Sequence, residues 1–299
     1  MPRTSLTSYQ SRRLRVLRRG VTRSVSDFNY LCRKAPHRVG IIAEGDSWFS
    51  YPRKYLIAGP DINLIHHLED VVSGSDAANL LVRSSNGDEA AAMLSAKQKY
   101  SMAKLLETNA EHINIILFSG GGNDLVGRYD MDRLLRSYKP GYTAQDCIDQ
   151  ARLERKLQRI VLAYSELLEL RNSYAPEAIV ITHTYDQVRP SNKGAELLRF
   201  YKTGPWILPF LEQKGIPKAL HADISHALLD QLSRSLQQLA STALAAERFL
   251  VVDTQGTLRP GHGSDWLNEI HPTASGFKRL FKLIYAAMRS ADSRLPKHS

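Results

Sequence analysis

Short apolar runs alternate with longer stretches of helical periodicity from residue 39 onward. Five of these runs have the length and β-branched content of buried strands. They are Val39–Ala43, Asn79–Ser84, Ile113–Ser119, Ala178–His183 and Phe249–Asp253. Helical patterns lie between them, at about 89–107, 145–172, 220–246 and 273–289. Strands that alternate with helices predict a parallel sheet with helices on both faces, and such sheets bind ligands at the carboxyl ends of their strands.

The first 38 residues follow a different pattern. Their apolar residues are spaced as one stripe of a helix, from which most arginines are excluded: Leu14, Leu17, Val21, Val25 and Phe28. Residues 1–40 hold ten basic residues and one acidic residue, whereas the remaining 259 residues hold 30 basic and 29 acidic ones. The net charge of +10 is therefore concentrated in a basic amphipathic arm, residues 1–38, in front of a neutral domain, residues 39–299.

Three interpretations of this arm are open. Its apolar stripe could pack on the main domain and leave the arginines in solvent. It could contact an anionic surface, either nucleic acid or membrane. Its Arg-rich, Ser/Thr-rich and acid-poor composition is also typical of an organellar targeting segment. No apolar segment of a secretory signal peptide follows the charges. We expect a cytoplasmic protein, with an organellar location as the alternative.

Composition excludes several other classes of protein and site. The longest apolar runs, such as Ile115–Phe118, are far shorter than the roughly 20 residues of a spanning helix. Cys32 and Cys147 form no paired motif, so we expect two reduced thiols. The histidine pairs lack the H-E-x-x-H spacing of a zinc site, and the glycine-rich segment near residue 122 lacks the Lys of a phosphate loop. The sequence predicts neither a metal nor a cofactor.

Residues 185–218, between the fourth strand and the next long helix, are rich in Pro, Gly and aromatic residues. The aromatic residues are Tyr185, Phe200, Tyr201, Trp206 and Phe210. This insertion could form a lid or one wall of a substrate pocket, with Tyr185 and Trp206 as candidate pocket residues. Alternatively, its aromatic side chains simply fill the core beneath it.

Residues suited to nucleophilic catalysis follow four of the five predicted strands. Ser47 comes directly after the first strand, and His271 after the fifth can serve as its base. Gly87 follows the second strand, where a residue without Cβ lets a backbone N–H approach a reacting group. Asn123 follows the third strand and can direct its side-chain amide to the same place. Together these residues supply a nucleophile, a base and donors for an oxyanion.

The order and strand-end position of these residues resemble the SGNH hydrolases, also called the GDSL esterase/lipase superfamily. The four matching blocks are Gly45-Asp46-Ser47, Asn86-Gly87, Gly121-Gly122-Asn123-Asp124 and His271-Pro272. The resemblance covers about residues 39–290. It implies a flavodoxin-like α/β/α sandwich with a five-stranded parallel sheet in the order 2-1-3-4-5.

The resemblance also implies the roles of these residues. Ser47 would attack an ester carbonyl, and His271 would accept its proton and deliver it to the leaving alcohol. The oxyanion hole would consist of the backbone N–H groups of Ser47 and Gly87 and the side-chain amide of Asn123. Water would then hydrolyse the acyl-enzyme, and no metal would take part.

The sequence departs from the family pattern at two positions. Trp48 replaces a leucine after the nucleophile and is a candidate residue of the substrate pocket. Asn268 stands three residues before His271, where the family usually has Asp, and Asp265 stands six residues before it. We favour Asp265 as the residue that orients His271, because a carboxylate also stabilises the imidazolium; Asn268 is the alternative.

We therefore predict a metal-independent serine esterase of the carboxylesterase, lipase or acetylesterase type, acting through an acyl-enzyme on Ser47. Its substrate would be a small-molecule, lipid or carbohydrate ester. The alternative is a protein that keeps the fold, has lost the chemistry through Asn268, and binds an anionic partner through its basic arm.

Overall fold

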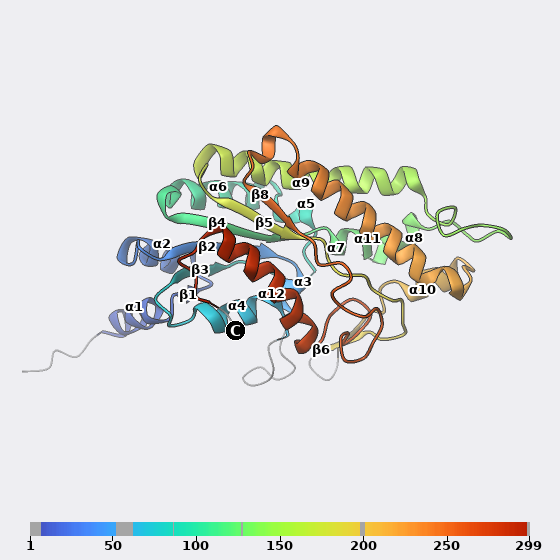
Figure 1. Cartoon of the computed structure of the whole chain (residues 1–299), viewed down its shortest axis with the longest axis horizontal. Coiled ribbons are helices and arrows are strands. Elements are labelled where there is room, and N and C mark those ends of the chain that lie inside the picture. Colours follow the sequence, from blue (N-terminus) through green and yellow to red (C-terminus); the bar gives the residue numbers. More distant parts are fainter. Residues whose placement is uncertain (1–6, 52–61, 86, 127, 198–200, 298–299) are drawn as a thin grey trace, which may run out of the picture.

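A parallel sheet with six strands forms the centre of the molecule (Figure 1). The computed structural model describes residues 7–51, 62–85, 87–126, 128–197 and 201–297. Within these residues the strand order is β1-β3-β2-β4-β5-β8, and β6 and β7 pair as a separate antiparallel hairpin. The strands are β1 (Val21–Thr22), β2 (Val39–Gly45), β3 (Ala78–Val82), β4 (Ile113–Ser119), β5 (Ile179–His183), β6 (Ala195–Leu197), β7 (Tyr201–Thr203) and β8 (Phe249–Val252).

Helices cover both faces of this sheet (Figure 1). On one face α9 packs against α5, α6 and α11, and on the other α12 packs against α4. The helices are α1 (Ser8–Arg19), α2 (Val25–Lys34), α3 (Ser47–Ser50), α4 (Leu64–Val72), α5 (Ala90–Met93), α6 (Ala96–Thr108), α7 (Gly122–Val126), α8 (Arg128–Leu134), α9 (Gln150–Tyr174), α10 (Leu208–Gln213), α11 (Lys218–Ala240) and α12 (Ala274–Ala291), with short 3₁₀ turns η1 (Ala110–His112) and η2 (Ala243–Ala245).

The five strands predicted from the sequence are present in the predicted order. In chain order they are β2, β3, β4, β5 and β8, and their order across the sheet corresponds to 2-1-3-4-5. The central strand β2 is buried along its whole length, and Ile41, Ile42 and Ile116 are fully buried. Burial on both faces explains why these strands are nearly continuous apolar runs rather than alternating ones. The α/β class is confirmed.

The sixth strand, β1, was not predicted. It contains only Val21 and Thr22, which pair in parallel with Leu80 and Leu81 of β3 at the edge of the sheet. The continuous helix predicted across Leu14 to Phe28 is therefore wrong. Helix α1 ends at Gly20, whose left-handed backbone (φ 72°) few other residues adopt readily, and α2 starts only at Val25.

The N-terminal segment 1–38 contributes to the core through α2. Phe28, Leu31 and Cys32 of this helix are fully buried. Much of the segment's positive charge is paired with carboxylates. These ion pairs are Arg12 and Arg13 with Asp27, Arg19 and Arg23 with Glu69, and Arg38 with Asp76. Part of the charge that suggested an anionic partner thus serves contacts within the chain.

The insertion 185–218 contains the β6–β7 hairpin and α10. Tyr185 is buried, and Trp206 and Phe210 pack against the core, so these aromatic residues fill space beneath the segment. Phe200 lies outside the described residues. The same segment reaches the edge of the sheet where the candidate catalytic residues lie, as shown below.

Three helical predictions also need correction at their boundaries. The pattern at 89–107 is divided into α5 and α6 around Leu94 and Ser95, the pattern at 145–172 starts as α9 only at Gln150, and the pattern at 220–246 ends as α11 at Ala240. Cys32 and Cys147 are both free and buried. In the described part of the chain, no helix is both long and apolar enough to cross a membrane.

Candidate active site

Ser47 and His271 meet at the carboxyl edge of the sheet. Ser47 is the first residue of α3, directly after β2, and His271 lies in the loop before α12. The Ser47 Oγ lies 2.8 Å from the Nε2 of His271, although the two residues are 224 positions apart. Asp46 caps α3 by accepting the backbone N–H of Trp48. This tight strand-to-helix turn directs the Ser47 hydroxyl to the edge of the sheet.

Asn268 holds the imidazole of His271 in one orientation. Its Oδ1 accepts the backbone N–H groups of Ile270 (3.2 Å) and His271 (2.9 Å), which establishes which end of the amide is the oxygen. The Nδ1 of His271 lies 3.0 Å from the same oxygen and must therefore donate its proton to it. The lone pair is then on Nε2, where it can accept the hydroxyl proton of Ser47.

Asp265, the preferred orienting residue in the sequence analysis, does not contact His271. Its carboxylate forms ion pairs with Arg259 (3.1 Å) and Arg279 (2.7 Å) and accepts the backbone N–H of Arg259. Hydrogen bonds from Arg259 hold the pKa of Asp265 well below its usual range. The Asp265 carboxylate is thus bound by two guanidinium groups and not by the imidazole. The residue that lies against His271 is the alternative, Asn268.

His271 is buried among aromatic side chains. The ring of Tyr51 lies 4.2 Å from it between centroids, and that of Trp206 lies 5.4 Å away in an edge-to-face contact. The Nδ2 of Asn268 donates to the Tyr51 hydroxyl at 3.2 Å. Burial lowers the pKa of His271 to about 3, because no solvent stabilises the imidazolium. The histidine is therefore a neutral base at physiological pH.

Sequence reasoning missed Tyr51, although a signal for it exists. It stands four residues after Ser47, and such residues lie on the same side of a helical turn. Its backbone N–H donates to the carbonyl of Ser47 at 2.7 Å. Tyr51 thus connects the turn that carries Ser47 to the residue that holds the His271 ring.

Of the candidate oxyanion donors, Asn123 lies beside Ser47 in the same pocket. Its Nδ2 donates one hydrogen bond to the backbone oxygen of Asp88 at 3.1 Å, and an amide nitrogen carries a second N–H. The adjacent Gly122 lies so close to Tyr185 that a Cβ there would stand 2.8 Å from the ring. Because Gly122 has no side chain, the first turn of α7 can pack directly on the Tyr185 ring that lines the pocket.

The backbone N–H of Ser47 is a second candidate donor for an oxyanion. Gly87, in contrast, does not reach the pocket. The N–H of Ser47 is at the first position of α3, where helical N–H groups have no partner within the helix. Gly87 is exposed, and no atom lies within 4 Å of where its Cβ would be. It is not among the described residues that line the pocket, and Asn86 lies outside the described residues.

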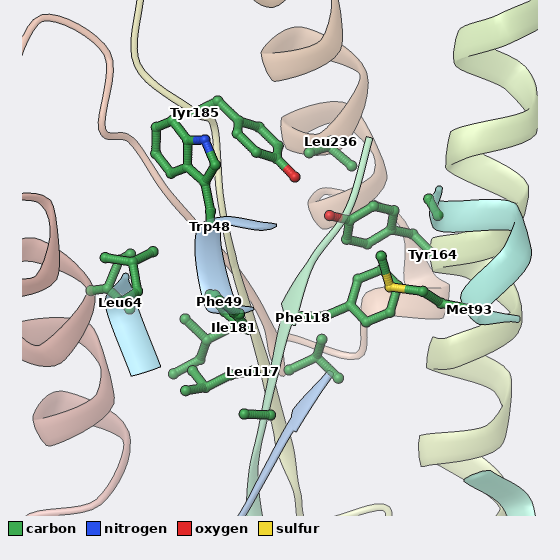
Figure 2. Packing of buried hydrophobic residues seen from close by; sticks show 14 of the residues in the cluster. Trp48, Phe49, Leu64, Met93, Leu117, Phe118, Tyr164, Ile181, Tyr185 and Leu236 are labelled. Carbon is green, nitrogen blue, oxygen red and sulfur yellow. The ribbon is translucent and has the colours of Figure 1, made fainter. Parts of the chain in front are cut away.

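The pocket beside Ser47 has mostly apolar walls. Trp48 and Tyr185, both predicted as pocket residues, line it, and Figure 2 shows the Trp48 indole beside the Tyr185 ring. Trp206 is not a lining residue; its neighbour Ile207 is, while Trp206 contacts His271. The other apolar lining residues are Leu125, Val126, Met131, Val188, Leu228, Leu229 and Ile270.

A second buried serine and histidine lie behind Trp48. His183 ends β5, and its Nδ1 accepts the backbone N–H of Tyr185 at 3.2 Å, so its Nε2 donates to Ser119 Oγ at 2.9 Å. Ser119 in turn donates to Asp46 Oδ1 at 3.0 Å, and the Tyr185 hydroxyl donates to Asp46 Oδ2. The Trp48 ring stacks on His183 at 5.2 Å. This network anchors the turn that carries Ser47.

Burial shifts the pKa values of Asp46 and His183 in this network, because neither residue has a charged partner of opposite sign. It raises the pKa of Asp46 to about 6, although hydrogen bonds from Tyr185 and Trp48 oppose the shift. It lowers the pKa of His183 to about 3. His183 is not among the site residues predicted from the sequence, although it ends the fourth predicted strand at the same edge of the sheet. In the described part of the chain, no cluster of three His, Cys, Asp or Glu side chains suits a metal ion.

No protein-family model and no curated protein matches the sequence. Several solved structures are similar to it. The chain is similar in fold to SGNH hydrolases. A lipase from a goat rumen metagenome is 17% identical, with a TM-score of 0.49 over 85% of this chain and 97% of the lipase. An extracellular lipase from Streptomyces rimosus is also 17% identical, with a TM-score of 0.49 over 83% of this chain and 99% of the lipase. A proposed SGNH hydrolase from Slackia heliotrinireducens is 12% identical, with a TM-score of 0.46 over 84% and 99%.

Proposed function

We propose that this protein is a serine hydrolase that cleaves an acyl ester through an acyl-enzyme on Ser47. The observation that carries the proposal is the 2.8 Å contact between Ser47 Oγ and His271 Nε2 beside an apolar pocket. The hydrogen bonds of Asn268 support the tautomer in which Nε2 accepts the serine proton. A serine hydroxyl becomes a useful nucleophile only when such a base is in place.

The reaction begins when Nε2 of His271 takes the hydroxyl proton as Ser47 Oγ bonds to the ester carbonyl carbon. The carbonyl oxygen becomes an oxyanion, which accepts hydrogen bonds from the Ser47 backbone N–H and the Asn123 amide. Cleavage of the bond to the alcohol oxygen then restores the carbonyl, and His271 delivers its proton to that oxygen. Water repeats the same two steps on the acyl-enzyme and releases the carboxylic acid.

Asn268 affects the energy of the charged intermediate. Its amide oxygen holds the tautomer of His271 but carries no full negative charge to stabilise the imidazolium. The buried, neutral ring of the resting enzyme agrees with this weaker support. We therefore infer a catalytic unit of Ser47, His271 and Asn268 in which Asn268 assists the reaction mainly by orienting the imidazole and not by stabilising its positive charge.

The pocket favours an ester with an apolar acyl group. Its charged lining residues, Asp46 and Asp186, already accept hydrogen bonds from groups of the protein. Placing a charged substrate group among the remaining apolar side chains would remove its hydration without a compensating partner. An acyl chain would instead bury apolar surface against them.

Two measurements on purified protein test this function. The first is release of nitrophenol from nitrophenyl acetate and nitrophenyl hexanoate. The second is covalent labelling by a fluorophosphonate, with the modified residue located by mass spectrometry. We expect hydrolysis and a label on Ser47, both lost in Ser47→Ala. A folded protein that shows neither would contradict the proposal and favour the alternative of an inactive binding protein.

A further inference from the structure

Glu269 is a buried carboxylate in the loop that carries Asn268 and His271. Its two oxygens accept four backbone N–H groups of the insertion 185–218. The donors are Ser191 (3.1 Å) and Leu208 (2.9 Å) to Oε1, and Ile207 (2.8 Å) and Trp206 to Oε2. The backbone N–H of Glu269 donates to the oxygen of Lys193 at 3.0 Å. One residue thus joins the loop of the base to two separate stretches of the insertion.

This arrangement requires a carboxylate. Each oxygen of Glu269 accepts two N–H groups, and a side-chain amide has only one oxygen that can accept. In either orientation of a glutamine, the NH₂ group would face two backbone N–H donors and leave them without an acceptor. Buried donors without an acceptor are strongly unfavourable, so the surrounding backbone would have to move.

The backbone that Glu269 binds carries two side chains that lie beside Ser47 and His271. Ile207 lines the pocket together with Ser47, and the ring of Trp206 contacts the edge of His271. The N–H groups of both residues are bound by Glu269. A shift of this stretch would therefore move one pocket wall relative to the nucleophile.

We propose that Glu269 is a positioning residue that determines acyl-chain selectivity by fixing the Ile207 wall relative to Ser47 and His271. The proposal rests on the serine hydrolase function proposed above. An acetyl group extends only two carbons from Ser47, whereas a hexanoyl chain would reach further into the pocket that Ile207 lines. Selectivity between the two esters consequently reports on the position of the wall.

The test compares Glu269→Gln with the parent protein on nitrophenyl acetate and nitrophenyl hexanoate. Active sites are counted by fluorophosphonate labelling, so that a misfolded fraction does not enter kcat. We expect kcat/KM for the hexanoate to fall by about tenfold more than for the acetate, mainly through a higher KM, because a small displacement of a wall weakens contacts along a chain. The matched control is Glu177→Gln, which changes an exposed glutamate ahead of β5, at the opposite edge of the sheet.

Equal losses on both esters with unchanged KM would overturn the proposal, because they would mean that Glu269 affects only the amount or rate of active enzyme. Hydrogen exchange gives a second readout that does not depend on catalysis. In folded Glu269→Gln we expect faster exchange at the amides of Ser191, Trp206, Ile207 or Leu208, and unchanged exchange at all four would also overturn the proposal. If the parent protein neither hydrolyses esters nor labels at Ser47, the proposed function fails by that result, whatever the exchange data show.

Discussion

Two serine–histidine pairs lie at strand ends of this molecule, and in only one of them can the histidine accept the serine's proton. Ser47 and His271 are 2.8 Å apart, and Ser119 and His183 are 2.9 Å apart. Both histidines are buried, and burial lowers the pKa of each to about 3. Distance, burial and charge state therefore do not distinguish the two pairs.

The difference lies in the atom that faces Nδ1. In His271 that atom is an acceptor, the oxygen of Asn268, so Nε2 is free to accept the serine proton. In His183 it is a donor, the backbone N–H of Tyr185, so Nε2 carries a proton and gives it to Ser119. The Ser119 hydroxyl consequently donates to Asp46, and His183 cannot act as its base. One hydrogen bond on the far side of the ring decides whether the serine beside it is activated.

The largest expected effect comes from removing each serine in turn. Ser47→Ala should lower kcat by roughly 10³-fold or more, because the attacking oxygen is absent. Ser119→Ala should keep the fluorophosphonate label on Ser47 and retain activity within about tenfold, because it removes a supporting hydrogen bond. Rates per amount of folded protein measure both, and fluorophosphonate labelling counts the active sites of Ser119→Ala. Comparable losses in the two variants would show that the pairs do not differ in the way described.

Asn123→Ala should have the next largest effect. We expect a fall in kcat on the order of 10² to 10³, with a small change in KM, because the amide meets charge that develops only in the transition state. Steady-state kinetics on nitrophenyl acetate provide the measurement. A higher KM at unchanged kcat would instead assign Asn123 to substrate binding and weaken the distinction between the two pairs.

Asn268→Asp alters the group that faces Nδ1 of His271. A carboxylate would favour the charged imidazolium and raise the pKa of His271, so the acidic limb of the pH–rate profile should move to higher pH. Above that limb kcat should rise by about tenfold, because the imidazolium gains a charged partner. The Tyr51 hydroxyl can donate to the new oxygen instead of accepting from the amide. An unchanged profile would show that this position does not tune the base.

Asp265→Asn should have the smallest effect on the reaction. Asp265 binds Arg259 and Arg279 and does not contact His271, so kcat should stay within about twofold of the parent value. Because its pKa is held below the usual value of about 3.9, its contribution to stability exists above that pH and disappears as the pH falls. Urea unfolding should show the variant to be less stable at pH 7, with the difference shrinking at acid pH. A large loss of kcat in the folded variant would restore Asp265 as the orienting residue.

The sheet was predictable because each of its five main strands is a separate buried run. The edge strand β1 was not, because Val21 and Thr22 are too few to show a strand period and also fit a helical stripe. The turn at Gly20 interrupts that stripe, and one glycine within an apolar pattern is a weak signal. The division between α5 and α6 was missed because neither Leu94 nor Ser95 is a glycine or proline that would mark a break.

The site was predictable in its residue types and less so in its hydrogen bonds. The positions of Ser47, Asn123 and His271 follow from the strand ends, since parallel strands bring these ends to one edge. The choice of Asp265 over Asn268 relied on charge and neglected local backbone chemistry. An Asn commonly accepts N–H groups two and three residues ahead, and Asn268 does so with Ile270 and His271. These two hydrogen bonds place the Asn268 oxygen beside the His271 ring.

The tryptophans of this protein provide a fluorescence signal from the candidate active site. The chain has three, and each belongs to the carboxyl edge of the sheet: Trp48 follows the nucleophile, Trp206 contacts His271, and Trp266 pairs with Pro272 beside that histidine. Intrinsic fluorescence from this protein is therefore a signal from the neighbourhood of Ser47 and His271 rather than an average over the fold. The proposed acylation and deacylation of Ser47 should therefore change this fluorescence in a stopped-flow instrument without a coloured substrate, and Trp206→Phe would reveal how much of the signal comes from the insertion.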